Sequence, residues 1–99
     1  MMMEEEYQSC WNMLALWQGG WMSVNGNPDV FIFQGYDSNY YLLAYSYDKE
    51  YGRGSFSYYE IVVDKEMYYI RMGMKSHRME SKESPSTLHI AGWGGYMKN

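Results

Sequence analysis

The fold of this chain is decided by the segment Gly19-Gly20-Trp21-Met22-Ser23-Val24-Asn25-Gly26-Asn27-Pro28-Asp29-Val30-Phe31-Ile32-Phe33. It predicts a strand over 21–24, a tight polar turn, and a second strand over 30–34. The Asn25-Gly26 step suits the positive backbone dihedrals of a hairpin turn, and Pro28 cannot donate a ladder hydrogen bond. We therefore expect an antiparallel hairpin, whose turn sets the strand register rather than forming a site.

The composition is that of one globular domain. Of the 99 residues, 46% are hydrophobic and 20% charged, and there are 12 Tyr and 4 Trp. A chain of this length buries about two-thirds of its unfolded surface, and dense tyrosine favours β structure. The net charge of -4 provides no global attraction to nucleic acid or anionic lipid.

The N-terminus and the cysteine content bear on location and cofactors. Met1 to Glu6 is acidic where a signal peptide needs positive charge, and no run approaches the roughly 18 apolar residues of a membrane span. Cys10 is the single cysteine, which excludes an intramolecular disulfide and a multi-cysteine zinc site. We expect a cytoplasmic protein with no cofactor and no membrane partner.

The chain is expected to form a single domain over 1–99, with a helix within 1–18 and a β-meander barrel over 19–99. Apolar residues recur at three-to-four spacing over 4–17, and Gly19-Gly20 ends this helix. Further strands are predicted over 40–47, 55–63, 67–72 and 87–91, while 92–97 either adds a short strand or closes the structure. The polar segment 74–86 is predicted to be a loop. Short turns between consecutive strands indicate an antiparallel meander of six to seven strands, forming a small barrel that is either closed or incomplete.

The opening Gly19-Gly20-Trp21 resembles the Gly-x-Trp start of lipocalin-type barrels. In that family a short helix precedes the first strand and the tryptophan plugs the barrel end. The resemblance implies a lipocalin-like barrel and raises the hypothesis of a small apolar ligand in its cavity. Six or seven strands make a narrow barrel, which we expect to be filled by its own side chains. Those side chains are Trp21, Ile32, Leu42 and Ile61.

A second resemblance covers most of the chain from Gly19 onward. The chain is similar to a family of uncharacterised small proteins carried on bacterial conjugative transposons. The similarity lies in Trp21-x-Ser23-Val24-Asn25-x-Asn27-Pro28-x-Val30-x-Ile32, in Tyr59-Glu60-Ile61 and in Gly95-Tyr96-Met97-Lys98-Asn99. This chain departs from the family at Gly95 and Lys98, where the family often carries an acidic residue and arginine. The family is a domain of unknown function, so the resemblance implies a fold and a genomic setting but no activity.

No catalytic constellation is visible, and we expect a protein that is not an enzyme. His77 and Glu80 could be two metal ligands, but a third is not evident and a solvated loop explains them better. His89 is expected on the solvated face of its strand, opposite Leu88 and Ile90.

Two sets of residues are the candidate binding sites. Trp21, Tyr59 and Glu60 are the candidates for a ligand site, with Glu60 of interest only if it is buried within its strand. Arg71, Lys75 and Arg78 are the candidates for weak binding of single-stranded nucleic acid, with tyrosines nearby to stack on bases. A solvated charged loop explains these basic residues better, so nucleic acid is an unfavoured partner.

The preferred hypothesis is an interaction module that forms a homodimer. Aromatic residues fall on both faces of the predicted strands, as in Tyr40-Tyr41, Tyr58-Tyr59 and Tyr68-Tyr69. Tyrosine and methionine are enriched at protein interfaces, and an incomplete sheet would leave edges for a second chain to pair with. The transposon resemblance adds a component of a conjugation system as a further candidate partner.

Overall fold

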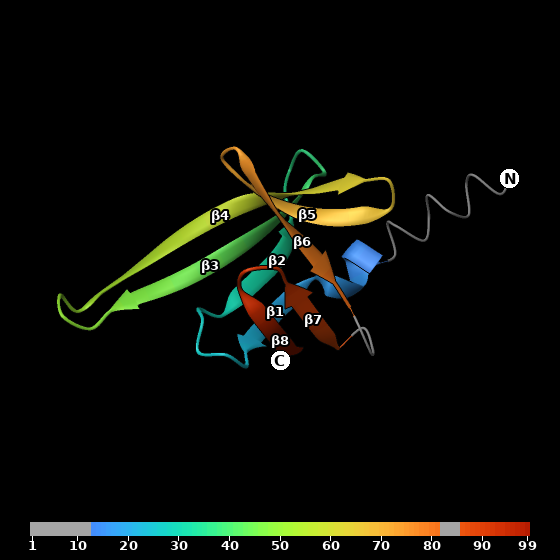
Figure 1. Ribbon diagram of the computed structural model, residues 1–99. Helices are drawn as coiled ribbons and strands as arrows, with labels where there is room; N and C mark the ends of the chain where they lie inside the picture. Colours follow the sequence, from blue (N-terminus) through green and yellow to red (C-terminus); the bar gives the residue numbers. More distant parts are fainter. Residues whose placement is uncertain (1–12, 82–85) are drawn as a thin grey trace, which may run out of the picture.

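The computed structural model describes residues 13–81 and 86–99, which form an antiparallel β-barrel with a short helical segment at 13–17. Figure 1 shows the strands following one another around the barrel in chain order. The strands are β1 (Gly19–Ser23), β2 (Val30–Gln34), β3 (Tyr40–Asp48), β4 (Arg53–Asp64), β5 (Met67–Met72), β6 (Lys75–Glu80), β7 (Thr87–Ile90) and β8 (Gly94–Lys98). The predicted mainly β meander with an N-terminal helix is confirmed. Cys10 and most of the predicted helix lie outside the described residues.

The barrel is closed by pairing between its first and last strands. β1 runs antiparallel to β8, with Trp21 opposite Lys98 and Met22 opposite Met97. All other neighbours around the barrel are consecutive in sequence. Of the two expected forms the closed one is found, and closure leaves no sheet edge where β1 and β8 meet.

The extra strand relative to the sequence prediction is β6, which lies in the segment predicted to be a loop. Its residues alternate, with Met79 buried and His77 half-buried, while Ser76 and Arg78 are exposed. Met79 is the one strongly apolar residue on the inward face, so the period-two signal of a strand is weak here. Pairing with β5 and β7 on its two sides fixes β6 in the sheet.

Side chains fill the barrel interior, as the narrow geometry predicts. Trp21, Ile32 and Leu42 are fully buried, and Ile61 is 5% exposed. Burying one large apolar side chain contributes about 1.5–3 kcal/mol relative to leaving it in water. The same core includes Val30, Tyr40, Ile70, Met79, Leu88, Ile90 and Tyr96.

The helical segment covers one end of the barrel. Leu14 and Trp17 on its inner side are buried in the core. The Trp17 ring meets Tyr68 edge to face at a centroid distance of 4.8 Å, and its Nε1 donates to Ser81 Oγ at 2.9 Å. The indole therefore joins the helix to Ser81, the residue that follows β6.

Trp21 plugs this same end, as the lipocalin resemblance implies. Its Nε1 donates to the Trp17 carbonyl oxygen at 2.8 Å, and Lys98 Nζ lies 4.8 Å from the centre of its ring. Lys98 Nζ also donates to the carbonyl oxygens of Leu16, in the last turn of the helix, and of Gln18, which follows it. Burial lowers the pKa of Lys98. Strand β8 is thus tied to the helix across the plugged end.

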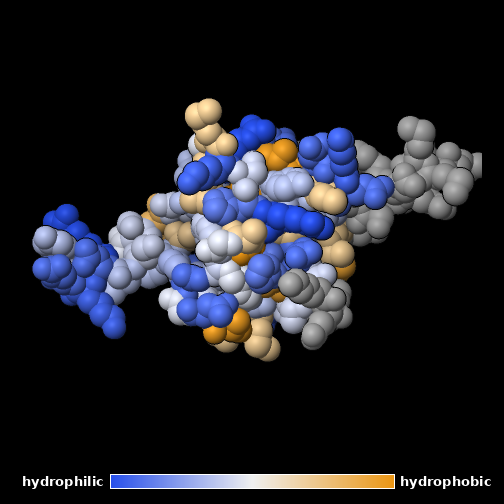
Figure 2. All heavy atoms as spheres, in the orientation of Figure 1, coloured by the Kyte–Doolittle hydropathy of each residue, from blue (hydrophilic) through white to orange (hydrophobic). Residues whose placement is uncertain are grey.

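At the opposite end, the β3–β4 hairpin projects well beyond the barrel (Figure 1). β2 pairs with β3 only as far as Ala44, and β5 pairs with β4 only from Ile61 onward, whereas β3 and β4 stay paired out to Asp48 and Arg53. Every residue from 45 to 58 is exposed. We call residues 45–58 the arm; Figure 2 shows it standing clear of the barrel with a hydrophilic tip.

The buried tyrosine of β8 makes the stability of the barrel sensitive to alkaline pH. Tyr96 is 1% exposed, and its hydroxyl donates to the Pro28 carbonyl oxygen at 3.3 Å. Burial, with a smaller contribution from the Asp29 charge, raises the pKa of Tyr96 to about 12. Its neutral form is therefore favoured by folding. This contribution is complete below the unfolded pKa of about 10 and is lost progressively as the pH rises toward 12.

We expect Tyr96→Phe to lose less stability than the wild type between pH 9 and pH 12. The difference should be roughly 2–3 kcal/mol, because two pKa units correspond to that free energy. Urea unfolding at a series of pH values measures it. Tyr36→Phe, which removes a fully exposed hydroxyl, is the control and should follow the wild type. Parallel loss of stability in Tyr96→Phe and the wild type would contradict the assignment.

Candidate functional site

Trp21, the first ligand candidate from the sequence, is part of the core. Its side chain has no exposed surface and is enclosed by the helix and Lys98. Its position lets it stabilise the barrel end, but it offers no surface that a ligand could reach in this structure.

Tyr59 and Glu60 lie on opposite faces of β4, so they do not share a site. Glu60 is exposed on the outer face and lies opposite Tyr41 of β3. Tyr59 is half-buried on the inner face, where its ring meets Trp93 edge to face at 5.8 Å. Glu60 would have been the centre of a site only if its carboxylate were buried, and it is exposed.

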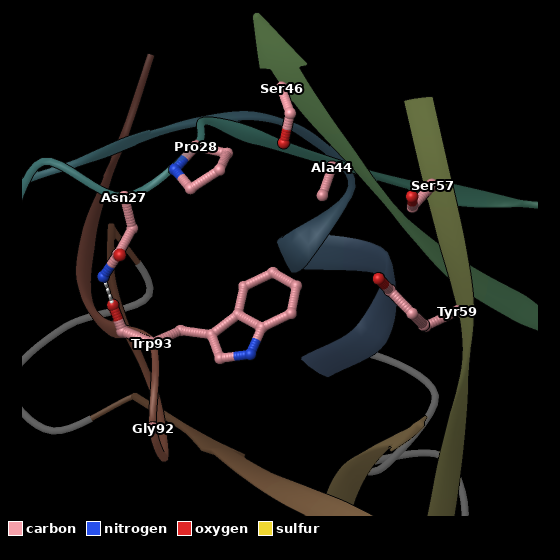
Figure 3. A pocket seen from close by; sticks show the side chains of 8 residues that line it. All are labelled: Asn27, Pro28, Ala44, Ser46, Ser57, Tyr59, Gly92 and Trp93. Atoms are coloured by element: carbon pink, nitrogen blue, oxygen red, sulfur yellow. Dashed lines mark hydrogen bonds between the residues drawn. The ribbon is translucent and has the colours of Figure 1, made fainter. Parts of the chain in front are cut away.

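Tyr59 and Trp93 form part of a concave mouth at the arm end of the barrel (Figure 3). The mouth has a volume of about 290 Å³. Ser46 and Ser57 from the base of the arm line one side of it, and Asn27 and Pro28 from the β1–β2 turn line the other. The side-chain Nδ2 of Asn27 donates to the Trp93 carbonyl oxygen, and this hydrogen bond joins the two turns that frame the mouth.

The β1–β2 turn is held in shape by its own polar side chains. Asp29 Oδ1 accepts from the Ser23 amide at 2.9 Å, and Ser23 Oγ accepts from the Asn27 amide at 3.0 Å. Asn25 Oδ1 accepts from the Gly95 amide at 2.7 Å, which connects the turn to β8. The turn thus fixes the register around the mouth.

The basic candidates do not converge on one surface. Arg71 and Arg78 are exposed on the outer face of β5 and β6. Lys75 pairs with Met72 and lies on the opposite face. Arg78 also forms an ion pair with Glu80 at 3.7 Å. The outer surface beside Arg71 is a shallow depression that also contains Asp64. The outer face of β5 and β6 therefore carries both positive charges, from the two arginines, and negative charges, from Asp64 and Glu80.

The histidine candidates are also separated. His77 lies on the inner face of β6, where Nδ1 is 2.8 Å from the Ala91 carbonyl oxygen, and Glu80 lies on the opposite face. His89 alternates with the buried Leu88 and Ile90, as predicted. Within 13–81 and 86–99 there is no group of three His, Cys, Asp or Glu side chains that could hold a metal ion.

The arm has two chemically different faces. Tyr45 and Phe56 lie opposite each other on the outer face, with ring centroids 4.9 Å apart, and Tyr58 follows on the same face. Serine side chains take the inner face, where Ser46 lies opposite Ser55. Phe56 is 64% and Tyr58 69% exposed. The outer face is therefore an aromatic surface in contact with water.

Strand β4 presents a free edge along the arm and just beyond its base. The ladder between β4 and β5 ends at the pair of Ile61 and Ile70, so Arg53–Glu60 pairs with β3 alone among the described strands. The backbone groups that point away from β3 over these eight residues have no strand to bond to. Such an edge is a ready template for another chain.

The aromatic surface continues from the arm onto the barrel. The Tyr41 ring stacks on Phe33 at 5.7 Å and meets Tyr58 at 6.3 Å. Tyr41 also donates from its hydroxyl to Asp37 Oδ2. This hydrogen bond lowers the pKa of Asp37 and raises the pKa of Tyr41. The Asp37 charge thus fixes the orientation of one ring of the surface.

Sequence reasoning missed the most prominent features of this site, namely the free edge of β4 and the role of Trp93. The alternation of serine with aromatic residues over 55–58 was a usable signal. Small polar residues on the inward face of a barrel strand indicate that the strand has left the core.

The part of the chain that the structure describes contains no helix long and apolar enough to cross a membrane. Comparisons with protein families, with curated proteins and with solved structures found no match to this chain.

Proposed function

We propose that this protein is a non-enzymatic interaction module that forms a homodimer through its arm. The observation that carries the proposal is the free edge of β4 over Arg53–Glu60 beside an exposed aromatic face. An isolated two-stranded hairpin is marginally stable in water. A strand from another molecule along this edge would extend the arm to a wider sheet, in which the backbone groups of the edge are paired.

A second copy of the chain is the partner that fits this edge best. Two identical edges can pair antiparallel about a two-fold axis, which is the commonest symmetry of homodimers. In such a pair the segment Arg53–Glu60 of one copy would run antiparallel to the same segment of the other, with the outer-face residues of both copies on the same side. The outer aromatic face would be continuous across such a pair, with Phe56 and Tyr58 near its centre.

The resemblance to the transposon family supports a genomic setting on a conjugative transposon, and a component of the conjugation machinery is a further proposed partner. Binding of single-stranded nucleic acid is a weaker proposal, because Arg71 and Arg78 share their surface with Asp64 and Glu80. Few uncompensated positive charges mean little counterion release.

Light scattering or sedimentation equilibrium at micromolar concentration tests the proposal. The wild type should have about twice the mass of the chain. Phe56→Lys/Tyr58→Lys should raise the dissociation constant by roughly 10-fold or more, because it removes aromatic cross-strand contacts and brings like charges together across the paired edges, each effect being about 0.2–1 kcal/mol. A strand edge bearing lysine also resists pairing.

The matched control is Met22→Lys/Met97→Lys. These methionines are about half exposed, lie opposite each other on β1 and β8, and undergo the same change in charge. This variant should remain a dimer. A monomeric wild type would contradict the proposal, and so would a control that dissociates while the arm variant does not.

A further inference from the structure

We propose that the mouth of the barrel is a binding site for a single neutral saccharide ring. The site opens on the inner side of the sheet, away from the outer aromatic face, and its residues Ser57 and Tyr59 also belong to the β4 segment whose edge is free. Its test measures sugar binding and does not rely on the dimer. Its volume of about 290 Å³ is at the lower end of small-molecule pockets, which span roughly 300–1,000 Å³. A ligand of one ring, rather than an extended chain, matches this size.

The mouth contains two aromatic rings set nearly at right angles. The Tyr59 and Trp93 rings meet at 83°, and the Trp93 indole points into the concavity from the β7–β8 turn (Figure 3). Aromatic rings offer apolar area together with a polar tip. A corner of this kind can hold a ring that presents C–H groups to one wall and hydroxyl groups to the other.

Four polar groups around this corner have no hydrogen-bond partner among residues 13–81 and 86–99. They are the hydroxyls of Ser46, Ser57 and Tyr59 and the Nε1 of Trp93. No side-chain polar atom in the described residues is buried without a partner, so these groups remain accessible to solvent. Three hydroxyls can both donate and accept, and the indole N–H donates. Together they can match the alternating donors and acceptors of a sugar ring.

The mouth has no charged residue in its lining, which favours a neutral ligand. No Asp, Glu, Lys, Arg or His lines it. A phosphate or carboxylate would meet no cation there, and desolvating a charge without a partner is costly. A purely apolar ligand is disfavoured for a related reason, because it would cover the four polar groups without satisfying them.

Titration of ¹⁵N-labelled protein with glucose, galactose, mannose and N-acetylglucosamine tests the site by NMR. The millimolar range is appropriate for a single ring with few hydrogen bonds. We expect saturable shifts of the Trp93 indole N–H and of the Ser57 and Tyr59 amides with at least one of these sugars. The indole N–H signals of Trp17 and Trp21 are internal controls, since both donate to fixed partners at the other end.

Two matched pairs of variants locate the contact. Tyr59→Phe and Ser57→Ala should each weaken binding by roughly 3- to 10-fold, as expected for one lost hydrogen bond. Tyr58→Phe and Ser55→Ala should leave it unchanged, because these residues lie on the same strand but outside the mouth. All four changes are small and keep the strand intact.

The proposal would be overturned if none of the four sugars shifts these signals. Preferential binding of uridine or adenosine in the same titration would also overturn it, by showing that the mouth selects a planar base. Equal weakening by Tyr58→Phe and Tyr59→Phe would also overturn it, by placing the ligand outside the mouth.

Discussion

Replacing Trp21 with alanine is expected to destabilise the protein by about 3–5 kcal/mol, the cost of emptying a large aromatic site in a core. Trp21 has no exposed surface, and its indole joins the helix, β1 and Lys98 at the plugged end of the barrel. The change also removes the hydrogen bond to the Trp17 carbonyl oxygen. Small domains have total stabilities of about 5–15 kcal/mol, so this variant should be close to unfolding at room temperature.

The control for this prediction is the next residue along the strand. Met22 is 50% exposed on the outer face of β1, and Met22→Ala should change the free energy of unfolding by no more than about 0.5 kcal/mol. Urea unfolding followed by far-ultraviolet circular dichroism measures both. Similar losses for the two variants would show that Trp21 is not the plug of the barrel.

Replacing Gly94 with alanine is expected to cost about 2–3 kcal/mol, from two sources. Gly94 has a φ of +98°, which an L-residue adopts only at a cost of roughly 1–2 kcal/mol. A Cβ on Gly94 would also overlap Asn25 Oδ1, the acceptor of the Gly95 amide. Losing that hydrogen bond adds about 1 kcal/mol and loosens the contact between the β1–β2 turn and β8.

Gly73→Ala separates these two contributions. Gly73 also has a positive φ, of +63°, but a Cβ there would meet nothing within 4 Å. Gly73→Ala should therefore lower the free energy of unfolding by only about 1 kcal/mol, which is the backbone contribution alone. Thermal and urea unfolding of both variants give the difference. Equal costs at the two positions would contradict the role assigned to Asn25.

The hairpin over 21–33 could be predicted because its signals are local. The apolar and polar residues alternate, and the Asn25-Gly26 step marks the turn, so β2 begins and ends where the sequence indicates. The role of Trp21 as a plug was implied by the resemblance of Gly19-Gly20-Trp21 to lipocalin-type barrels. The strand β6 could not be predicted in this way, because only Met79 distinguishes its inward face and its identity as a strand depends on β5 and β7.

The sites depend on relations between distant parts of the chain. Whether Glu60 is buried could not be decided from β4 alone, because both faces of that strand carry aromatic residues. The mouth requires the β1–β2 turn, the base of the arm and Trp93 to meet, and no local pattern encodes that meeting. The free edge likewise exists only because β5 separates from β4 at Ile61.

Hydrogen exchange of the β4 backbone amides, measured by NMR at two protein concentrations, tests the central claim most directly. In an antiparallel ladder successive amides point alternately toward and away from the neighbouring strand, so about half of those in Arg53–Glu60 face β3 and half face the free edge. The amides facing β3 are the internal control. We predict that the amides facing the free edge are protected at a concentration where the protein is dimeric and lose protection on dilution. Exchange of these amides at the same rate at both concentrations would contradict pairing through the edge of the arm.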